Sequence, residues 1–357
     1  MLKNDLRLRA ATTRPYFPEL DGVRAIAALM VMVFHFGQDW YSSKLLVFGQ
    51  TGVDLFFVLS GFLITTILLR SRQGDWHEIR NFYIRRTLRI FPLYYGYLLG
   101  VCLLGGTVSL CYWGYLQNLA AAFGGPLHLA APSGPAHFWS LGVEEQFYLV
   151  WPFLILFWPR RWLAHAMWGM VVFSILLRVA LIGSSVDTFR FTLTRLDGLG
   201  AGGLLAYYYF RGVLGRFKPL LMALAPLALL SLVVEKMASH GTGVAWVEVM
   251  KYTSATVLYV ALIGLLVTTE DSWMHRILRT KPMRGIGGVS YGMYVYHPAI
   301  FMALPGYLGG LPILAKAAIC FAVVYLVALA SFYGFERPFV GLKARLASEK
   351  PFRAVTA

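Results

Sequence analysis

Long apolar stretches recur along this chain, and each is close to the length that crosses a lipid bilayer. The sequence is 58% hydrophobic and only 14% charged, with a mean hydropathy of +0.62. This composition lies outside the range of soluble domains, and a helix needs about 20 apolar residues to span the hydrocarbon core. The 357 residues leave no room for a sizeable soluble domain, so we expect one membrane domain over 1–357.

The apolar stretches predict an all-α polytopic membrane protein with about ten transmembrane helices. The expected spans are 20–38, 52–70, 88–105, 141–158, 165–183, 196–211, 218–235, 251–269, 286–305 and 312–333. The stretch 109–123 is different, because counting it as a span would place Arg160 and Arg161 outside the cell. The positive-inside rule opposes that placement, so we predict a re-entrant or interfacial helix there.

The distribution of basic residues orients these spans. A net charge of +15 in a soluble protein would suggest nucleic acid or another anionic partner. Here most of the 32 Lys and Arg residues fall in 1–24, 70–89, 159–162, 211–218, 275–284 and 337–357. These segments lie on one side of the predicted membrane, as the positive-inside rule requires. We therefore expect both termini in the cytoplasm, the lipid bilayer as the main partner, and no nucleic acid.

Residues 22–36, GVRAIAALMVMVFHF, form an apolar span that carries Arg24 and His35. Eleven helical steps are only about 20° past three full turns, so the two side chains share a face, separated by roughly 16 Å. Ionisable groups at membrane depth are costly unless they pair or reach water, which makes them functional candidates.

Further ionisable residues fall near the predicted outer ends of other spans. Together with His35 these are Asp54, Glu144, Glu145, Arg195, Asp197 and His297. Each also has a structural explanation. His35 can be a packing residue or form a helix–helix hydrogen bond. Asp54, Glu144 and Glu145 can favour the positive end of a helix dipole. Arg195 with Asp197 can form an interfacial ion pair. His297 precedes Pro298, where its ring can satisfy a freed backbone group. The shared depth, rather than any one residue, favours a site.

A basic cluster, FYIRRTLRIFP, marks the predicted cytoplasmic mouth of the third span. Arg86 and Arg89 are three residues apart and share a helix face. They serve either as topology determinants or as phosphate ligands, for which guanidinium groups are well suited. No spacing typical of a metal site is present, and Cys102, Cys111 and Cys320 show none typical of disulfides. The stretch LDGLGAGGLLA predicts close helix packing through small residues.

Seven motifs in order resemble the acyltransferase-3 family of polytopic membrane O-acyltransferases. They are FPELDGVRAIAALMVMVFHF, GVDLFFVLSGFLI, RRTLRIFPLYY, FWSLGVEEQFYLVWP, RLDGLGAGGLLA, SYGMYVYHPAIF and FERPF, and they cover about 16–340. The family's Arg-x10-His signature falls on Arg24 and His35, its R-x-x-R on Arg86 and Arg89, and its glutamate on Glu144. The chain ends soon after FERPF, as expected for the stand-alone form without a C-terminal hydrolase-like domain.

The resemblance implies a multi-pass acyltransferase of the bacterial inner membrane, with no permanently bound cofactor. Such an enzyme moves an acyl group, usually acetyl, from cytoplasmic acyl-coenzyme A to a hydroxyl of a glycan or other cell-surface acceptor. We expect the donor phosphates on Arg24, Arg86 and Arg89. His35 would act as general base or acyl carrier, oriented by Asp54 or Glu144. Glu145, Arg195, Asp197 and His297 would form a supporting polar shell.

A transporter or proton-coupled flippase of polysaccharide precursors is the alternative. It also explains many spans and buried ionisable groups. Against it, the polar residues gather near one face rather than at the midplane, and no inverted repeat is visible. For an acyltransferase, the outer loops 39–50, 124–138 and 184–194 are expected to shape the acceptor site.

Overall fold

The computed structural model describes residues 16–40, 44–71, 76–124, 135–238 and 245–347. Within these ranges the regular structure is helical and contains no β-strand, which confirms the all-α prediction. The longer helices are α2 (Pro18–Trp40), α3 (Gly52–Ser71), α4 (Trp76–Leu103), α7 (Trp139–Phe157), α8 (Arg160–Ala180), α9 (Leu196–Phe210), α10 (Lys218–Ala238), α11 (Ala245–Thr268), α14 (Ser290–Tyr307) and α15 (Ile313–Ser331). Shorter pieces are η1 (Lys44–Thr51), η2 (Ala136–Phe138), η3 (Thr192–Thr194), η4 (Leu214–Phe217), α12 (Trp273–Leu278), α13 (Lys281–Gly288), η5 (Phe332–Glu336) and α16 (Arg337–Leu346).

Each of the ten expected spans corresponds to a helix, but only six described segments are long and apolar enough to cross a membrane. These are Pro18–Gly37, Phe48–Arg70, Arg160–Ala180, Leu214–Ala238, Val249–Thr268 and Ile313–Lys343. Helix α9 has 15 residues, fewer than the roughly 20 that a perpendicular crossing needs. The chain is thus a multi-pass membrane protein, while the count of ten and the cytoplasmic termini stay predictions. Both termini lie outside the described residues.

The stretch 109–123 does not form one continuous helix. It contains α5 (Leu110–Trp113) and α6 (Gln117–Ala122), joined by a turn in which Tyr115 has a φ of 56°. The buried side chain of Gln117 donates to the carbonyl of Phe138 over 2.7 Å. This anchors the segment against the beginning of α7, and its re-entrant or interfacial position stays a prediction.

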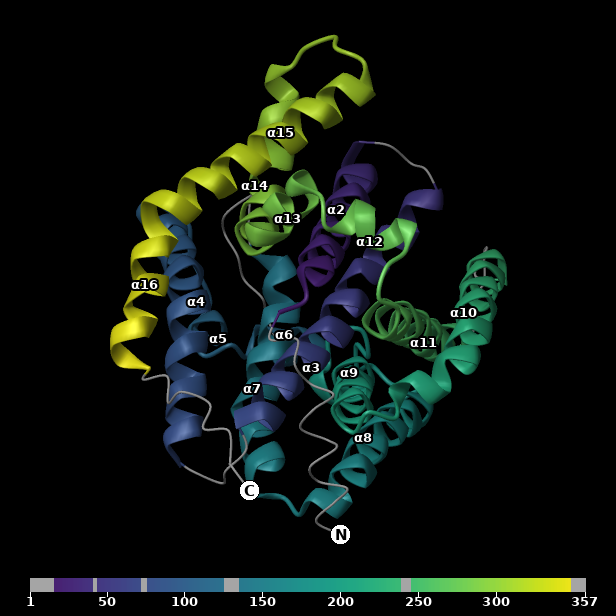
Figure 1. Ribbon diagram of the computed structural model, residues 1–357. Helices are drawn as coiled ribbons and strands as arrows, with labels where there is room; N and C mark the ends of the chain where they lie inside the picture. Colours follow the sequence, from purple (N-terminus) through teal and green to yellow (C-terminus); the bar gives the residue numbers. More distant parts are fainter. Residues whose placement is uncertain (1–15, 41–43, 72–75, 125–134, 239–244, 348–357) are drawn as a thin grey trace.

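Helices α2, α3 and α9 lie in the middle of the molecule, between α4 and α16 on one side and α10 and α11 on the other (Figure 1). Helices α3 and α9 approach closely because glycines face the partner backbone. A Cβ on Gly61 would lie 2.1 Å from the carbonyl oxygen of Leu199, and one on Gly202 would lie 2.1 Å from that of Val58. The predicted small-residue packing is confirmed, and it brings the start of α9 to the start of α3.

Helix α14 packs against α2 and α15 through a buried apolar cluster. Met32 and Phe36 of α2 meet Met293 and Phe301 of α14, together with Val324 of α15. This packing sets the C-terminal half of α2 directly beside α14.

Many apolar side chains on the outer helices face away from the protein. Leu176 of α8, Leu227 of α10 and Leu326 of α15 are each about 60% exposed (61%, 60% and 61%). Such faces suit contact with lipid rather than with water, which agrees with a protein embedded in a bilayer.

Candidate active site

A cavity of about 230 Å³ opens beside His35. Gln50, His137 and Phe189 line it, one from each of the three segments expected to shape the acceptor site. The remaining wall residues come from α2, the start of η2, α3, α7, α14 and the loop before α9: Val31, Phe34, Val53, Ala136, Trp139, Arg190 and Tyr294. Helix packing thus brings the three segments together around the histidine that the sequence singled out.

His35 is hydrogen-bonded to a second histidine. Its Nδ1 lies 2.9 Å from Nε2 of His297, whose own Nδ1 lies 2.8 Å from the carbonyl oxygen of Tyr294. Pro298 has no N–H, so it cannot donate to Tyr294 four residues earlier, as a regular helix requires. The structural explanation for His297 is confirmed, since its ring satisfies the freed carbonyl. In addition, His297 contacts His35.

A third histidine, His137, was missed by the sequence analysis. Its ring centroid lies 5.3 Å from that of His297, and it lines the same cavity. Burial lowers the pKa of His137 to about 3, so it is neutral at physiological pH. It lies in a Gly- and Pro-rich stretch, and no motif in that stretch indicates a functional residue. Within the described ranges, no group of three or more His, Cys, Asp or Glu residues is arranged to hold a metal ion.

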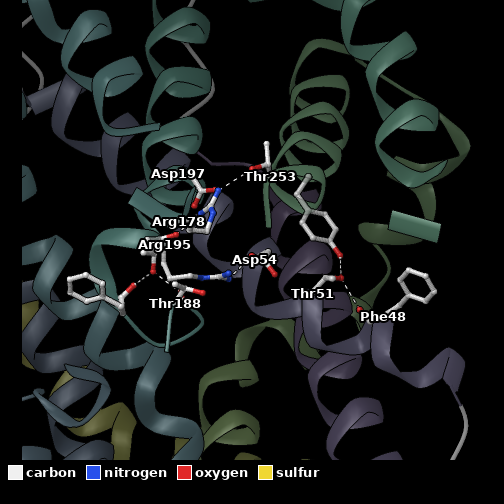
Figure 2. Close-up of polar contacts among 11 residues, drawn as sticks. Phe48, Thr51, Asp54, Arg178, Thr188, Arg195, Asp197 and Thr253 are labelled. Carbon is white, nitrogen blue, oxygen red and sulfur yellow. Dashed lines mark hydrogen bonds and ion pairs between the residues drawn. The ribbon is translucent and has the colours of Figure 1, made fainter. Parts of the chain in front are cut away.

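Asp54, Arg195 and Asp197 belong to a buried ion network (Figure 2). Arg195 Nη2 lies 2.5 Å from Asp54 Oδ1, and Arg178 Nη2 lies 2.7 Å from Asp197 Oδ2. Arg178 also donates to Thr253 of α11 over 2.9 Å, so the network ties α3, α8, α9 and α11 together. Arg178 was not identified as part of this group from the sequence.

The ion network supports the cavity wall from behind. The guanidinium of Arg195 lies 5.9 Å from the ring centroid of Trp139 and 5.7 Å from that of Phe189, and both rings line the cavity. The prediction that Asp54 orients His35 is therefore not what the geometry shows. Asp54 is held by Arg195, and the ring that contacts His35 is that of His297.

Glu144 and Glu145 are also not partners of His35. Glu144 accepts a hydrogen bond of 2.8 Å from Ser60, and Arg86 lies 3.6 Å from each of the two glutamates. The expectation that these glutamates and Arg86 lie at opposite membrane faces is wrong. Arg86 stands about 15 Å along α4, which begins at Trp76 rather than near 88, and Glu144 stands about 8 Å along α7.

Arg24 and Arg89 lie with Arg86 and the two glutamates in a third group, which we call the arginine–glutamate cluster (Arg24, Arg86, Arg89, Glu144 and Glu145). Arg24 pairs with Asp21 at 2.9 Å, and its side chain is 39% exposed. Arg89 donates to the carbonyl of Gly288 over 3.3 Å and lies within electrostatic range of Arg24 and Arg86. The predicted site residues thus fall into three groups: the histidine pair, the ion network and the arginine–glutamate cluster.

The fold and these groups define a multi-pass helical membrane protein with a polar site enclosed between its helices. The model of the family described as "Acyltransferase domain" matches residues 17–332, so the chain belongs to the acyltransferase-3 family. The resemblance carried by the seven motifs is confirmed.

Several curated relatives match most of this chain. The peptidoglycan O-acetyltransferase OatA of Listeria monocytogenes is 28% identical over 362 residues, covering 91% of this chain and 56% of the relative. The Bacillus subtilis protein YrhL, provisionally described as a peptidoglycan O-acetyltransferase, is 29% identical, with 90% and 55% covered. The chain therefore spans about half the length of the curated relatives it matches. No solved structure matches it.

Proposed function

We propose that this chain transfers an acetyl group from acyl-coenzyme A to a hydroxyl of a peptidoglycan-type glycan at a bacterial inner membrane. The observation that carries the proposal is the position of His35 on the wall of a cavity that three distant loop segments enclose. Membership of an acyltransferase family and the names of the relatives supply the reaction class and the acceptor class.

The acceptor would occupy the cavity beside His35. Trp139 and Phe189 offer aromatic rings for the apolar faces of a sugar, while Gln50 and Arg190 offer polar groups for its hydroxyls. Ligand sites commonly combine an apolar lining with a few polar groups that fix orientation. The cavity's composition therefore suits a glycan better than a purely apolar molecule.

The donor would approach from the arginine–glutamate cluster. Arg24 lies on the same helix face as His35, roughly 16 Å along α2, so a long, narrow pantetheine arm would run between them. Arg86 is already compensated by Glu144 and Glu145, so we assign the phosphates mainly to Arg24 and Arg89, with Arg86 completing the group.

His35 would act on the acceptor hydroxyl. As general base, it takes the hydroxyl proton while the oxygen attacks the thioester carbonyl carbon. The new C–O bond forms, the C–S bond breaks, and the proton passes to the coenzyme A thiolate. In the covalent variant, Nε2 of His35 attacks the thioester carbonyl carbon, a C–N bond forms, the C–S bond breaks and coenzyme A leaves as the thiolate. The acceptor hydroxyl then attacks the acyl-imidazole, the C–N bond breaks, and the hydroxyl proton passes to the thiolate. Trapping of an acyl adduct on His35 distinguishes the two routes.

The proposal is tested with purified protein in detergent, acetyl-coenzyme A labelled in the acetyl group, and a soluble peptidoglycan fragment. We expect labelled acetyl ester on the fragment with the wild type, and loss of at least 100-fold of the rate with His35→Ala. The matched control is His165→Ala, because His165 is an exposed histidine on α8. Normal transfer by His35→Ala would overturn the proposal.

The same experiment addresses the transporter alternative. A flippase moves substrate between compartments and makes no new ester, whereas an acyltransferase turns over in detergent without a closed membrane. Membership of the acyltransferase family does not favour the transporter.

A further inference from the structure

The hydrogen bonds around the two histidines determine where their protons reside. Nδ1 of His297 faces two carbonyl oxygens, that of Tyr294 at 2.8 Å and that of Met293 at 3.2 Å. A carbonyl only accepts hydrogen bonds, so Nδ1 of His297 must carry a hydrogen. In a neutral imidazole the other nitrogen is then an acceptor.

The protonation state of His297 in turn determines that of His35. Nε2 of His297 is the acceptor, and it lies 2.9 Å from Nδ1 of His35. Nδ1 of His35 must therefore donate, which leaves its Nε2 without a proton. His35 lines the cavity, so the ring nitrogen left for chemistry is a lone pair rather than an N–H.

We infer that His297 is a positioning residue, which holds His35 in the tautomer whose Nε2 can accept a proton or an acyl group. This inference rests on the proposed function of His35. In serine hydrolase triads a carboxylate performs this task; here a buried imidazole performs it, itself oriented by a helix carbonyl. Pro298 contributes to this arrangement, because it has no N–H and leaves the carbonyl of Tyr294 free to accept a hydrogen bond from His297.

The surroundings of His297 agree with this role. Its side chain is fully buried at 0% exposure, beside the rings of His137 and Phe301. Among the described residues, no carboxylate forms an ion pair or hydrogen bond with either histidine of the pair. A neutral acceptor avoids the large cost of placing an unpaired charge at this position.

Two substitutions separate positioning from packing. His297→Gln keeps a hydrogen-bond acceptor that can reach the position of Nε2, whereas His297→Leu fills the space without one. We expect the Leu variant to lower kcat by about 100-fold, since a wrong histidine tautomer is severely damaging in triads. KM for acetyl-coenzyme A should stay within about twofold, and the Gln variant should regain at least tenfold in kcat over the Leu variant. Equal kcat values for the two variants, with both still folded by thermal unfolding, would overturn the inference.

A second measurement does not depend on activity. Protein labelled with ¹⁵N-histidine, with the His35 signals assigned by comparison with His35→Ala, reports the tautomer of each ring directly. In the wild type we expect His35 to be protonated on Nδ1 and unprotonated on Nε2. In His297→Leu we expect a mixture of the two tautomers. A wild-type His35 protonated on Nε2 would overturn the inference even if acetyl transfer is normal. Absence of acetyl transfer by the wild type, with the expected tautomer present, would instead overturn the proposed function.

Discussion

Arg195 Nη2 lies 2.5 Å from Asp54 Oδ1, and this single ion pair fastens the first turn of α3 to the start of α9. Both side chains are almost completely buried, at 1% and 8% exposure. The pair stands behind the two aromatic rings of the cavity wall, Trp139 and Phe189, so it links the stability of the helix core to the shape of the site.

Asp54→Asn should destabilise the folded protein. The substitution leaves the buried guanidinium of Arg195 without its counter-charge, and breaking such a pair costs about 3–5 kcal/mol. Thermal unfolding of the purified protein in detergent measures the effect. The control is Glu270→Gln, at an exposed position where a change within about 0.5 kcal/mol is expected. Equal unfolding temperatures for the two variants would show that the pair is not important for stability.

Gly202→Ala should also destabilise the protein, for a steric reason. The added methyl group would lie 2.1 Å from the carbonyl oxygen of Val58, so α3 and α9 must separate. Overpacking of this kind typically costs about 1–3 kcal/mol. At Gly100 in α4 nothing lies within 4 Å of an added Cβ, so Gly100→Ala should be neutral or stabilising by up to about 1 kcal/mol. The order of the two unfolding temperatures tests the argument, and a reversed order would contradict it.

Arg89→Ala should weaken binding of the acyl donor. A charge-assisted hydrogen bond contributes about 1.5–3 kcal/mol, which corresponds to at least a tenfold rise in KM for acetyl-coenzyme A. Steady-state kinetics at saturating acceptor measure this change. Arg85→Ala is the matched control, because Arg85 belongs to the same basic cluster on α4 but is exposed. An unchanged KM for the donor in Arg89→Ala would reject the phosphate role.

Phe189→Ala should affect the acceptor and not the donor. The ring lines the cavity beside His35, and losing an aromatic contact of about 1 kcal/mol raises the acceptor KM roughly fivefold. The control is Phe173→Ala, because Phe173 is 48% exposed on the outer face of α8. A rise in the KM for acetyl-coenzyme A, with that for the glycan fragment unchanged, would assign the cavity to the donor instead.

Much of this architecture follows from the sequence alone. The apolar stretches predict the helices because a buried or lipid-facing helix must satisfy its backbone internally, whatever its neighbours. The positions of Arg24 and His35 on one face of α2 follow from helical geometry within a single element. The glycines of LDGLGAGGLLA predict close packing because only small residues permit it.

The pairing of the polar residues was decided by tertiary structure. Nothing within residues 139–157 says that Glu144 meets Arg86 of another helix, because an ion pair depends on how deep each helix sits and how it is rotated. His137 lies in a Gly- and Pro-rich stretch that carries no recognisable motif. It belongs to the site because η2 packs against α14, where its ring contacts those of Tyr294 and His297. The sequence by itself determined the helices and the individual candidates, such as His35 and His297. Only packing decided that these two histidines share a hydrogen bond while Asp54 faces Arg195, because contacts between distant segments depend on the arrangement of all the helices together.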